Sequence, residues 1–387
     1  MSAHEAAVAT PRPLRVLHYV SGGFSGATQV AIDLCAPDAR QQTKLVLRRR
    51  VSVDPSERVA QMRARGMDVV IAPRWPRLAA VLTVVRICRC WKPDVVVAHG
   101  FTEHIWGLWG AWLAGVPCMI HVEHNVRERY SPLLRWQSLW LAQRTSAIVG
   151  VAGAVCDALR RAGRPPETCR VIINGINLER FSAGLPWEQR EDAIVMPARF
   201  AAQKDQATLI RAAALLAARG VTVPIYLAGA GRPGWMRRAE RLARELGVQE
   251  QVHFLGQVSD LPSLMGRVKL CVLSTHYEGL GLGLIEGMAS GCCAIGSDVE
   301  GVRECFVDGE SGVLVPHADP AALADTVQKL LAPGSRAAEI AARGREWAHA
   351  HFDRRRMVNE YLDLIAEVGG AAKGIDSSPA KDAGDVA

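Results

Sequence analysis

Short apolar runs alternate with longer amphipathic segments along almost the whole chain. In the first half, apolar runs rich in β-branched residues predict strands at 14–20, 44–47, 68–71, 94–100, 116–125 and 146–151. Segments with helical spacing of apolar residues lie between them, at 28–34, 78–91 and 154–163. The strand at 94–100 contains an unbroken run of valines, which is typical of a parallel sheet covered on both faces.

The second half repeats this alternation. Strands are predicted at 193–198, 223–229, 252–256, 269–274, 293–297 and 312–315. Helices are predicted at 206–218 and 235–246, and residues 320–367 are expected to be helical. Alternating strands and helices indicate an α/β protein with right-handed crossovers. The pattern therefore predicts two α/β domains with parallel sheets, side by side, and a cleft between them of the kind where ligands usually bind.

The length of 387 residues also favours two domains, because a single core rarely grows so large. The dipeptide Asn174-Gly175 is a turn signal, and the next clear strand begins only at 193, so we place the boundary near residue 180. The expected division is a flexible tail at 1–13, a first domain at 14–180, a second domain at 181–350, a helix at 351–368 that packs back towards the first domain, and a disordered tail at 369–387.

Charge is divided unequally between the halves. Residues 1–180 hold 24 Lys and Arg against 13 Asp and Glu, whereas the remainder holds 22 against 26. The basic excess therefore belongs to the first half, which should favour anionic partners such as a phosphorylated substrate or an anionic membrane surface. Nucleic acid is a weaker interpretation, because no nucleic-acid-binding module is recognisable.

The cysteines and the N-terminus bear on location. The ten cysteines include no Cys-x-x-Cys pair and no zinc-like Cys/His spacing, so we expect no metal site and a reducing, cytoplasmic setting. The first residues lack the layout of a signal peptide. The longest uncharged apolar run, 105–120, is shorter than the roughly 20 residues that a spanning helix needs. We expect a protein that is soluble or peripheral at the inner face of a membrane.

Tryptophans form two groups with different interpretations. Trp106, Trp109 and Trp112 recur every three residues along one predicted helix, and packing in the core is the favoured interpretation. A second group combines tryptophan with arginine, an arrangement suited to a membrane interface, where rings lie at headgroup level and cations meet phosphates. Its members are Trp136, Trp140, Arg127, Arg129, Arg135 and Arg144.

The candidate chemistry centres on the stretch from Glu278 to Glu286. These two carboxylates bracket seven residues that are all apolar or glycine, although unpaired carboxylates are costly to bury. The end of the stretch is expected to begin a helix, whose first N–H groups suit a phosphate. Arg199 and Lys204 follow the strand at 193–198 and could neutralise a diphosphate, or could be ordinary charges on an exposed loop. We favour a phosphorylated ligand whose hydroxyl groups are held by the two glutamates.

A glycine-rich turn follows the first strand. Gly22, Gly23 and Gly26 lie between the strand at 14–20 and the helix at 28–34. Such a strand–glycine–helix unit meets phosphates or sugars at the carboxyl end of a sheet, or is simply a tight turn. It is not Gly-x-Gly-x-x-Gly, which makes a dinucleotide-dependent dehydrogenase an unfavoured interpretation.

Together these motifs resemble a known family. The motifs are Pro197-Ala198-Arg199-Phe200 with Lys204-Asp205, Phe254-Leu255-Gly256-Gln257-Val258, Glu278 and Glu286 with seven residues between, Gly287-Met288-Ala289-Ser290-Gly291, and Val171 to Phe181. Over about residues 14–365, the chain resembles the retaining family 4 glycosyltransferases. The resemblance implies the α/β GT-B fold, in which two Rossmann-like, doubly wound parallel-sheet domains face each other across a cleft. The resemblance implies a nucleotide-sugar donor that is UDP- or GDP-linked, no other cofactor and no divalent metal. No Asp-x-Asp sequence occurs, in agreement with that implication.

The resemblance implies a role for each matching position. Arg199 and Lys204 would hold the donor diphosphate, Glu286 the ribose hydroxyls, and Glu278 the donor sugar. The backbone of Gly279, Leu280 and Gly281 would also meet the sugar, and Gly22, Gly23 and Gly26 would approach the donor from the first domain. His124 would touch the reacting centre, with His121 and His99 as competing candidates. Glu123 would orient His124 or simply be exposed.

The chain departs from the family pattern at four positions. Leu280 stands where phenylalanine is usual, Gly283 near a usual proline, Gly287 where alanine is frequent, and Ala152 where serine is frequent. None of these changes removes a charged group, but the extra glycine leaves the donor sugar open. The first domain would bind the acceptor, expected to be a saccharide or lipid-linked molecule of cell-surface polysaccharide or glycolipid synthesis.

The reaction expected from the resemblance is attack on the same face from which the diphosphate leaves, with the departing phosphate accepting the proton of the acceptor. Two other functions stay open at this stage. A sugar-nucleotide isomerase of the same fold would convert the donor without an acceptor. A non-catalytic membrane-surface module would have kept the fold alone, although intact Arg199, Lys204, Glu278 and Glu286 argue against it.

Overall fold

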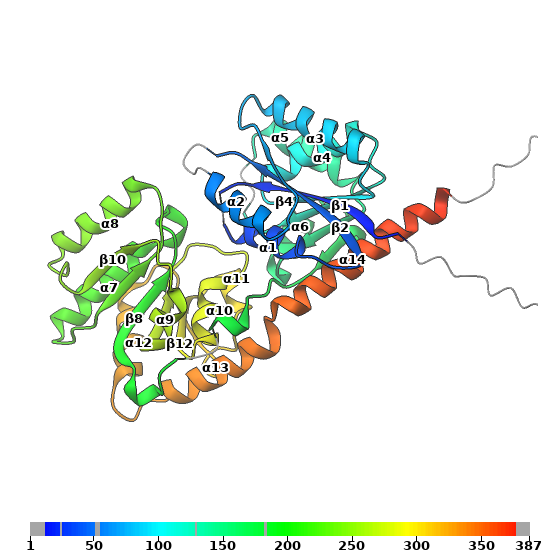
Figure 1. Ribbon diagram of the computed structural model, residues 1–387. Helices are drawn as coiled ribbons and strands as arrows, with labels where there is room; N and C mark the ends of the chain where they lie inside the picture. The colour runs from blue at the N-terminus through cyan, green and yellow to red at the C-terminus, as the bar shows by residue number, and fades with distance from the viewer. Residues whose placement is uncertain (1–11, 24, 51–54, 128–129, 182–183, 377–387) are drawn as a thin grey trace, which may run out of the picture.

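The computed structural model describes residues 12–23, 25–50, 55–127, 130–181 and 184–376. It confirms the prediction of two parallel-sheet α/β domains (Figure 1). The residues 1–11 of the expected N-terminal tail, and 377–387 of the C-terminal tail, lie outside the described residues. Among the described residues, we find no helix that combines the length and apolarity of a membrane-spanning segment.

The first sheet has seven strands in the described residues, in the order β3-β2-β1-β4-β5-β6-β7, and every pairing is parallel. The strands are β1 (Leu14–Ser21), β2 (Gln41–Arg48), β3 (Val69–Ala72), β4 (Val95–His99), β5 (Cys118–Glu123), β6 (Ala147–Gly150) and β7 (Cys169–Val171). The helices are α1 (Gly26–Leu34), α2 (Ser56–Ala64), α3 (Arg77–Trp91), α4 (Glu103–Leu113), α5 (Pro132–Ala142) and α6 (Gly153–Arg161). Strand β4 is buried at every position, as the apolar run from Val95 to Ala98 requires, and β5 is equally buried although it contains His121 and Glu123.

The second sheet has six described strands in the order β10-β9-β8-β11-β12-β13, again parallel throughout. Its strands are β8 (Glu191–Pro197), β9 (Ile225–Ala228), β10 (Val252–Gly256), β11 (Val268–Leu273), β12 (Cys293–Ser297) and β13 (Val313–Val315). Its helices are α7 (Gln206–Ala218), α8 (Pro233–Glu245), α9 (Leu261–Arg267), α10 (Leu282–Ala289), α11 (Glu300–Arg303), α12 (Pro320–Leu331) and α13 (Ala337–His351). Short 3₁₀ turns are η1 (Pro166–Thr168), η2 (Leu178–Phe181), η3 (Trp187–Gln189) and η4 (Ala202–Lys204). In both sheets the order reverses beside the first strand of the domain, at the topological switch point where α/β sheets bind ligands.

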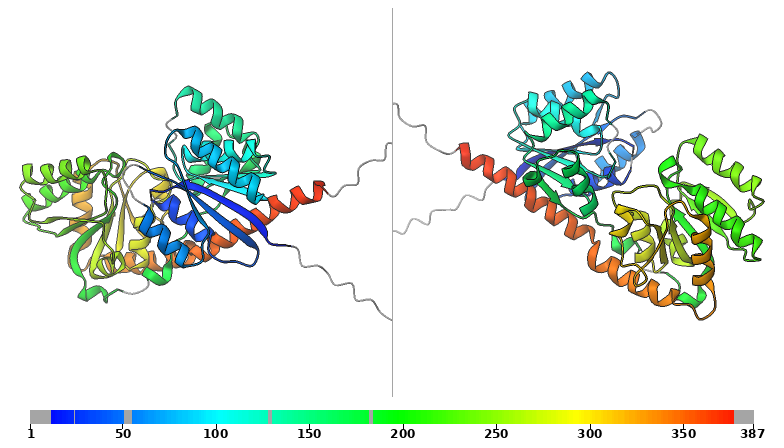
Figure 2. Two further views of the ribbon diagram at one scale, coloured as in Figure 1. Left: turned by 45° about the horizontal axis from the view of Figure 1, so that its top comes forward. Right: turned by 180° about the vertical axis from the view of Figure 1, so that it is seen from behind.

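A long last helix connects the domains. Helix α14 (Arg354–Asp376) follows α13 and runs along the first domain, where it contacts α1, β4 and β5 (Figures 1 and 2). The Arg354 guanidinium lies 3.2 Å from the Asp33 carboxylate, and the Cys118 thiol donates to the Val368 carbonyl at 3.1 Å. Residues 369–376, which the sequence analysis assigned to a disordered tail, are helical. Their alanine- and glycine-rich composition obscured a helix that the first domain supports.

The structure corrects the interpretations of both tryptophan groups, the one expected in the core and the one combined with arginine. Trp112 is 41% exposed, and Trp106 and Trp109 are only half-buried, so core packing is wrong for Trp112 and incomplete for the other two. Arg127 does not belong to the expected tryptophan–arginine patch, because its guanidinium lies 4.6 Å from the ring of Tyr277 in the other domain. Arg129 lies outside the described residues. The all-parallel arrangement places α3, α4 and α5 in one layer, and these tryptophans lie on its outer side.

Candidate functional site

The glycine loop of the first domain is held close to the neighbouring strand end. Gly22 donates its N–H to the Arg48 carbonyl at 2.9 Å, and a Cβ on Gly22 would lie 3.1 Å from that oxygen. A Cβ on Gly23 would lie 2.9 Å from the side chain of Arg50. Gly26 begins α1, and a Cβ there would lie 3.3 Å from Leu282, the first residue of α10. The helix starts of the two domains therefore face each other.

Lys204 and Glu278 form an ion pair at the carboxyl edge of the second sheet. The Lys204 ammonium lies 2.5 Å from a Glu278 carboxylate oxygen, and Thr275 donates its hydroxyl to the same oxygen at 2.8 Å. Lys204 follows β8 and Glu278 follows the neighbouring β11, so the parallel sheet brings residues 74 positions apart into contact. Both side chains are largely buried, which makes an unpaired carboxylate costly here.

Gln203 ties the two loops together. Its amide donates to the Tyr277 carbonyl at 2.8 Å, and its own carbonyl accepts from His276 N–H and the Thr275 hydroxyl. Arg199 is exposed and its guanidinium donates to the Gln203 side chain at 3.3 Å. The structure thus leaves Arg199 able to swing towards a ligand while Lys204 is held in place.

Glu286 lies inside α10, and no salt bridge to it is found within the described chain. Its environment is apolar, with Gly287 packed on Cys271 and the neighbours Leu284 and Ile285 buried. Burial raises the pKa of Glu286 to about 7, opposed by the positive charge of Arg180. A carboxyl group that titrates near neutrality without an ion-pair partner is well suited to accept hydrogen bonds from ligand hydroxyls.

His124 follows β5 and belongs to the junction between the domains. Both of its ring nitrogens are inaccessible to solvent and lack a hydrogen-bond partner among the described residues. Burial lowers its pKa to about 3, so the imidazole is neutral near pH 7. A neutral ring with two unsatisfied nitrogens can donate to or accept from a polar ligand but carries no charge of its own.

Glu123 is not exposed, as one alternative held, and it bonds the backbone of His124, whose ring nitrogens have no hydrogen-bond partner among the described residues. Glu123 is buried, and one carboxylate oxygen accepts the backbone N–H groups of His124 and Asn125 at 2.8 and 3.1 Å. Its other oxygen lies 3.6 Å from His121 Nε2. Burial raises the pKa of Glu123 to about 7, although the two backbone hydrogen bonds lower it. The carboxyl group therefore fixes the backbone that follows the last residue of β5.

His121 and His99, the competing candidates, belong to a buried histidine cluster behind His124. His99 Nε2 lies 3.2 Å from His18 Nδ1, and the rings of His104 and His121 stack with centroids 3.7 Å apart. Both candidates are almost fully enclosed, whereas His124 is half-buried at the junction.

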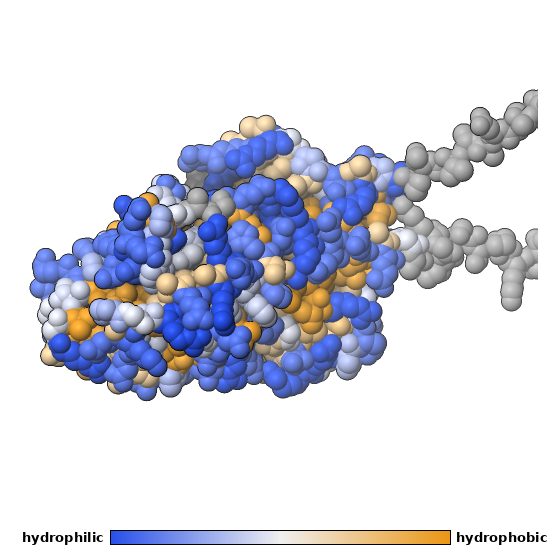
Figure 3. Space-filling view, turned by 90° about the horizontal axis from the view of Figure 1, so that it is seen from below, coloured by the Kyte–Doolittle hydropathy of each residue, from blue (hydrophilic) through white to orange (hydrophobic). Residues whose placement is uncertain are grey.

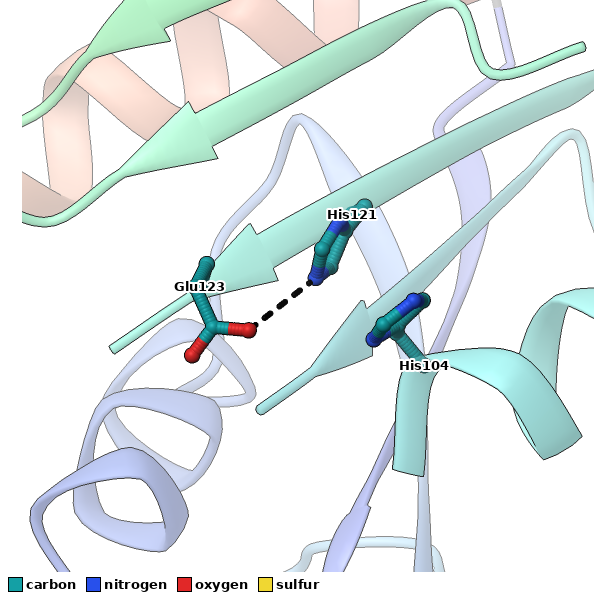
Figure 4. Close-up of side chains that lie close together, drawn as sticks. All are labelled: His104, His121 and Glu123. Carbon is teal, nitrogen blue, oxygen red and sulfur yellow. Dashed lines mark ion pairs between the residues drawn. The ribbon is translucent and has the colours of Figure 1, made fainter. Parts of the chain in front are cut away.

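His104, His121 and Glu123 come close enough to be considered as metal ligands (Figure 4). Their donor atoms lie within 4.8 Å of one another. However, His104 Nε2 is already bonded to the Ser138 hydroxyl at 2.9 Å, and that oxygen accepts from the buried Arg164 guanidinium at 2.7 Å. A guanidinium at this distance repels a second cation. We therefore interpret His104, Ser138 and Arg164 as a buried hydrogen-bonded group, beside which His121 and Glu123 lie.

The second-domain stretch reaches His124 directly. A Cβ on Gly279 would lie only 2.2 Å from the His124 carbonyl oxygen, so glycine is required for this close approach. Leu280 is buried, and Gly281 is the N-cap of α10. The backbone from 279 to 281, predicted to contact the donor sugar, therefore lies along the junction. The structure thus brings His124, the glycine loop and the Glu278 stretch together.

Gly279→Ala is expected to force the domains apart and weaken any activity that needs them together by tenfold or more. The added methyl group collides with backbone, which cannot rotate away. We would measure turnover and compare the radius of gyration in solution with that of the wild type. Gly234→Ala is the matched control, because a Cβ there meets nothing within 4 Å. Unchanged turnover and radius in Gly279→Ala would contradict the contact.

Two further junction residues were missed by the sequence analysis. Glu304 accepts the N–H groups of Gly153 and Ala154 at 2.7 and 2.5 Å, and so caps α6 from the other domain. The available signal was Ala152, which precedes α6 and cannot cap it with its own side chain. Tyr277, beside Glu278, receives the Arg127 guanidinium on its ring. No sequence signal links those two residues.

Two family models match the chain in succession. Residues 25–180 match the model described as Glycosyltransferase Family 4, and residues 178–347 match Glycosyl transferases group 1. The two matches meet between the sheets, and together they include every predicted site residue except Gly22 and Gly23.

Individual relatives agree with these matches. EpsD of Bacillus subtilis (strain 168) is 33% identical over 241 residues, which are 59% of this chain and 62% of that protein. The Escherichia coli UDP-Gal:alpha-D-GlcNAc-diphosphoundecaprenol alpha-1,3-galactosyltransferase is 21% identical over 60% of this chain and 65% of its own length. The alignments thus span less than two thirds of either relative.

A solved structure shares the fold over most of the chain. The crystal structure of Anabaena HepE in complex with UDP-glucose superposes with a TM-score of 0.81 and 20% identity, over 92% of this chain and all of that one. At this identity the likeness establishes the architecture of two facing Rossmann-like domains, the GT-B fold.

Proposed function

Because this chain belongs to the group 1 and family 4 glycosyltransferases with the GT-B fold, we propose that it transfers a sugar from a nucleoside diphosphate sugar to an acceptor hydroxyl. The observation that carries the proposal is the Lys204–Glu278 ion pair, which lies on the loops after neighbouring strands of the second sheet. The stretch that begins at Glu278 then meets His124 of the first domain through Gly279. A cation, two carboxylates and a neutral imidazole are thereby gathered at one junction.

Each group has a role suited to its environment. Lys204 would give its positive charge to the donor diphosphate, exchanging part of its interaction with Glu278 for one with phosphate. Exposed Arg199 would join it from the same loop. Glu278, no longer fully engaged, would accept hydroxyl groups of the donor sugar, and Glu286 those of the ribose. HepE was solved with UDP-glucose, which supports a UDP-linked donor as the first to test.

The proposed reaction retains the configuration of the sugar. His124 is neutral, and the Glu123 carboxylate is held by backbone N–H groups, so neither is a suitable nucleophile for the anomeric carbon. The acceptor hydroxyl would attack from the side on which the diphosphate leaves, and the leaving phosphate oxygen would take its proton. Lys204, Arg199 and the start of α10 would stabilise the charge that develops on the diphosphate, and no divalent metal has a role in this proposal.

The acceptor is proposed to be a lipid-linked or membrane-borne saccharide. The basic excess of residues 1–180 supports an anionic acceptor surface. The Escherichia coli relative acts, by its name, on a diphosphoundecaprenol-linked sugar. We propose that the protein works in the cytoplasm at the inner face of the membrane.

Replacing Glu286 by glutamine should weaken UDP-glucose binding about tenfold at pH 8 and reduce the pH dependence of binding near pH 7. Only the ionised carboxylate accepts hydrogen bonds with charge assistance, and burial raises its pKa to about 7. Wild-type affinity should therefore rise as the pH increases through 7, and the variant should show a smaller rise. Calorimetry between pH 6 and 8 measures this, with Glu250→Gln, an exposed carboxyl of the same domain, as control.

A panel of UDP- and GDP-linked sugars, tested with the full chain for binding and for slow hydrolysis, examines the proposed function itself. We expect donors with one nucleotide base to bind and to be hydrolysed in preference to donors with the other base. Conversion of a donor to a different nucleotide sugar without an acceptor would instead indicate an isomerase. Absence of binding to every member would refute the proposed function.

A further inference from the structure

The outer side of the α3–α4–α5 layer exposes an unusual number of large apolar side chains. Trp75 and Trp136 are 73% and 58% exposed, and Leu133 is 64% exposed. We call this surface the tryptophan face and define it by its exposed members, Trp75, Leu78, Leu82, Trp112, Leu113, Leu133 and Trp136. Isolated exposed apolar residues are ordinary, whereas a contiguous patch marks an interaction site.

The contacts between the three helices show that the face is continuous. Leu78 and Leu82 are four residues apart on α3, and the Arg77 guanidinium lies 5.4 Å from the ring of Trp106 on α4. The Trp109 and Trp140 rings stack with centroids 4.9 Å apart, which joins the outer stripe of α4 to that of α5. Trp112 packs edge-on against Trp140. These contacts join the three helices into one layer, and the exposed apolar side chains lie on these helices or directly before α3.

The charges around the face have one sign. Residues 69–93 contain Arg74, Arg77, Arg86, Arg89 and Lys92 but no Asp or Glu. Helix α5 contains Arg135 and no acidic residue, and Arg144 follows it with its guanidinium 3.5 Å from the Trp140 ring. The single acidic residue of α4, Glu103, is buried against Arg48. Arginines thus surround the aromatic groups without acidic partners on these helices.

Within the part of the chain that the structure describes, no element outside the α3–α4–α5 layer covers this face. The layer lies on the side of the first domain away from the second domain and from α14 (Figures 1 and 2). The opposite side of the protein is mainly hydrophilic, with smaller hydrophobic areas between (Figure 3). Among the described residues, the most exposed large apolar side chains, Trp75, Leu133 and Leu78, all belong to the tryptophan face.

We infer that the tryptophan face docks on a membrane surface rich in anionic lipid. Tryptophan and leucine would enter the headgroup region while the arginines meet lipid phosphates. A second copy of the chain is a poorer occupant, because two faces of equal positive charge repel each other. The docking itself is inferred from the exposed side chains and the charge of the face. Its role rests on the proposed function, because docking would bring a membrane-borne acceptor to the junction.

The position of the face fits that purpose. Helices α3, α4 and α5 run antiparallel to the strands, so their first residues lie at the carboxyl edge of the sheet, as His124 does. Trp75, Leu78, Leu133 and Trp136 are all near those helix starts. The most exposed apolar groups therefore lie along the edge that leads to the junction.

Vesicle sedimentation with the full chain tests the inference. At low salt, we expect the protein to pellet with phosphatidylcholine vesicles that contain phosphatidylglycerol, and to release as salt rises. The triple variant Leu78→Ser/Leu133→Ser/Trp136→Ser should partition at least tenfold more weakly, because three apolar side chains no longer enter the interface. The variant Arg86→Glu/Arg89→Glu should partition onto the anionic vesicles several-fold more weakly for each arginine replaced, and this difference should be seen only at low salt.

The controls separate this result from other causes. Leu246→Ser, an equally conservative change at an exposed leucine of the second domain, should partition like the wild type. All variants should retain wild-type hydrolysis of the nucleotide sugar in solution, so failure of docking and failure of the proposed function are distinguishable. Equal binding to pure phosphatidylcholine, no binding at low salt, or a dimer that the triple variant abolishes would overturn the inference.

Discussion

Lys204→Ala should lower sugar transfer by about 10²- to 10³-fold, the usual effect of removing one group that stabilises developing charge. The diphosphate leaves with added negative charge, and Lys204 is the cation that the second sheet holds in a fixed place, 2.5 Å from Glu278. The exposed Arg199 cannot substitute for it, because its side chain would first have to be ordered. Glu278→Ala should also be severe, because the donor sugar loses a hydrogen-bond acceptor.

Folding and function must be separated in this test. Lys204→Ala leaves the buried Glu278 carboxylate without its cation, which should lower the free energy of unfolding by about 1–3 kcal/mol. Adding Glu278→Gln should restore most of that stability without restoring transfer. Steady-state transfer and urea unfolding, measured on the same preparations, distinguish the two effects.

Lys269→Ala is the matched control. Lys269 also forms an ion pair, with Asp192 at 2.6 Å, but it lies at the opposite, amino edge of the same sheet. Its loss should leave transfer unchanged. If Lys204→Ala and Glu278→Ala both keep near-normal transfer, the site assignment is wrong.

The protein should lose stability steeply on acidification, with the largest fall between pH 6.5 and 4.5. Burial lowers the pKa of His18 and His124 to about 3, and that of His99, His104 and His121 well below the ordinary value. An unfolded histidine titrates near 6.5, so the unfolded chain binds more protons than the folded chain in this range. Stability therefore rises with pH through the window and falls as the pH is lowered.

Two buried carboxyl groups act in the opposite direction. The pKa values of Glu123 and Glu286 are raised to about 7, so between about 4.5 and 7 the folded chain holds their protons more tightly and stability falls as pH rises. The five histidines take up protons when the chain unfolds, and the two carboxyl groups release them, so unfolding takes up a net of about three protons. The free energy of unfolding therefore changes by about 4 kcal/mol per pH unit. With that slope, the free energy of unfolding of an ordinary domain would fall to zero within about three pH units.

Urea unfolding at pH 7.5, 6.5 and 5.5 measures this slope. His99→Gln can keep a hydrogen bond to His18 and should reduce the slope by about 1.4 kcal/mol per pH unit. His253→Gln, an exposed histidine of the second domain, should leave it unchanged. Equal stability at pH 7.5 and 5.5 would show that the histidines are not neutral in the folded protein.

Prediction from the sequence agrees best with the structure where a local pattern of residues can be accommodated by only one kind of structure. The valine-rich strands are buried because apolar β-branched runs have nowhere else to pack, and the alternation of strands with helices leaves a parallel sheet as the main solution. The ends of parallel strands meet at one edge, so Lys204 and Glu278 could be assigned to one site without knowledge of their distance.

Other features depended on partners far away in the chain. The period-three tryptophans predict a helix correctly, but periodicity does not say whether a face meets the core or water, and Trp112 faces outward. Arg127 belongs to a basic sequence segment yet stacks on Tyr277 of the other domain. Residues 369–376 have a composition typical of a disordered tail, but they continue the helix that packs on the first domain.

The sequence by itself determined the two-domain α/β fold, the family, and the charged residues at the strand ends, because these depend on local pattern and spacing. Contacts between distant segments, which only the folded chain reveals, bond Lys204 to Glu278, hold the backbone of His124 on Glu123, and bury four histidines, His18, His99, His104 and His121. Pairing and burial are properties of residues that meet from distant segments, and they set the pKa values and the contacts on which the chemistry depends.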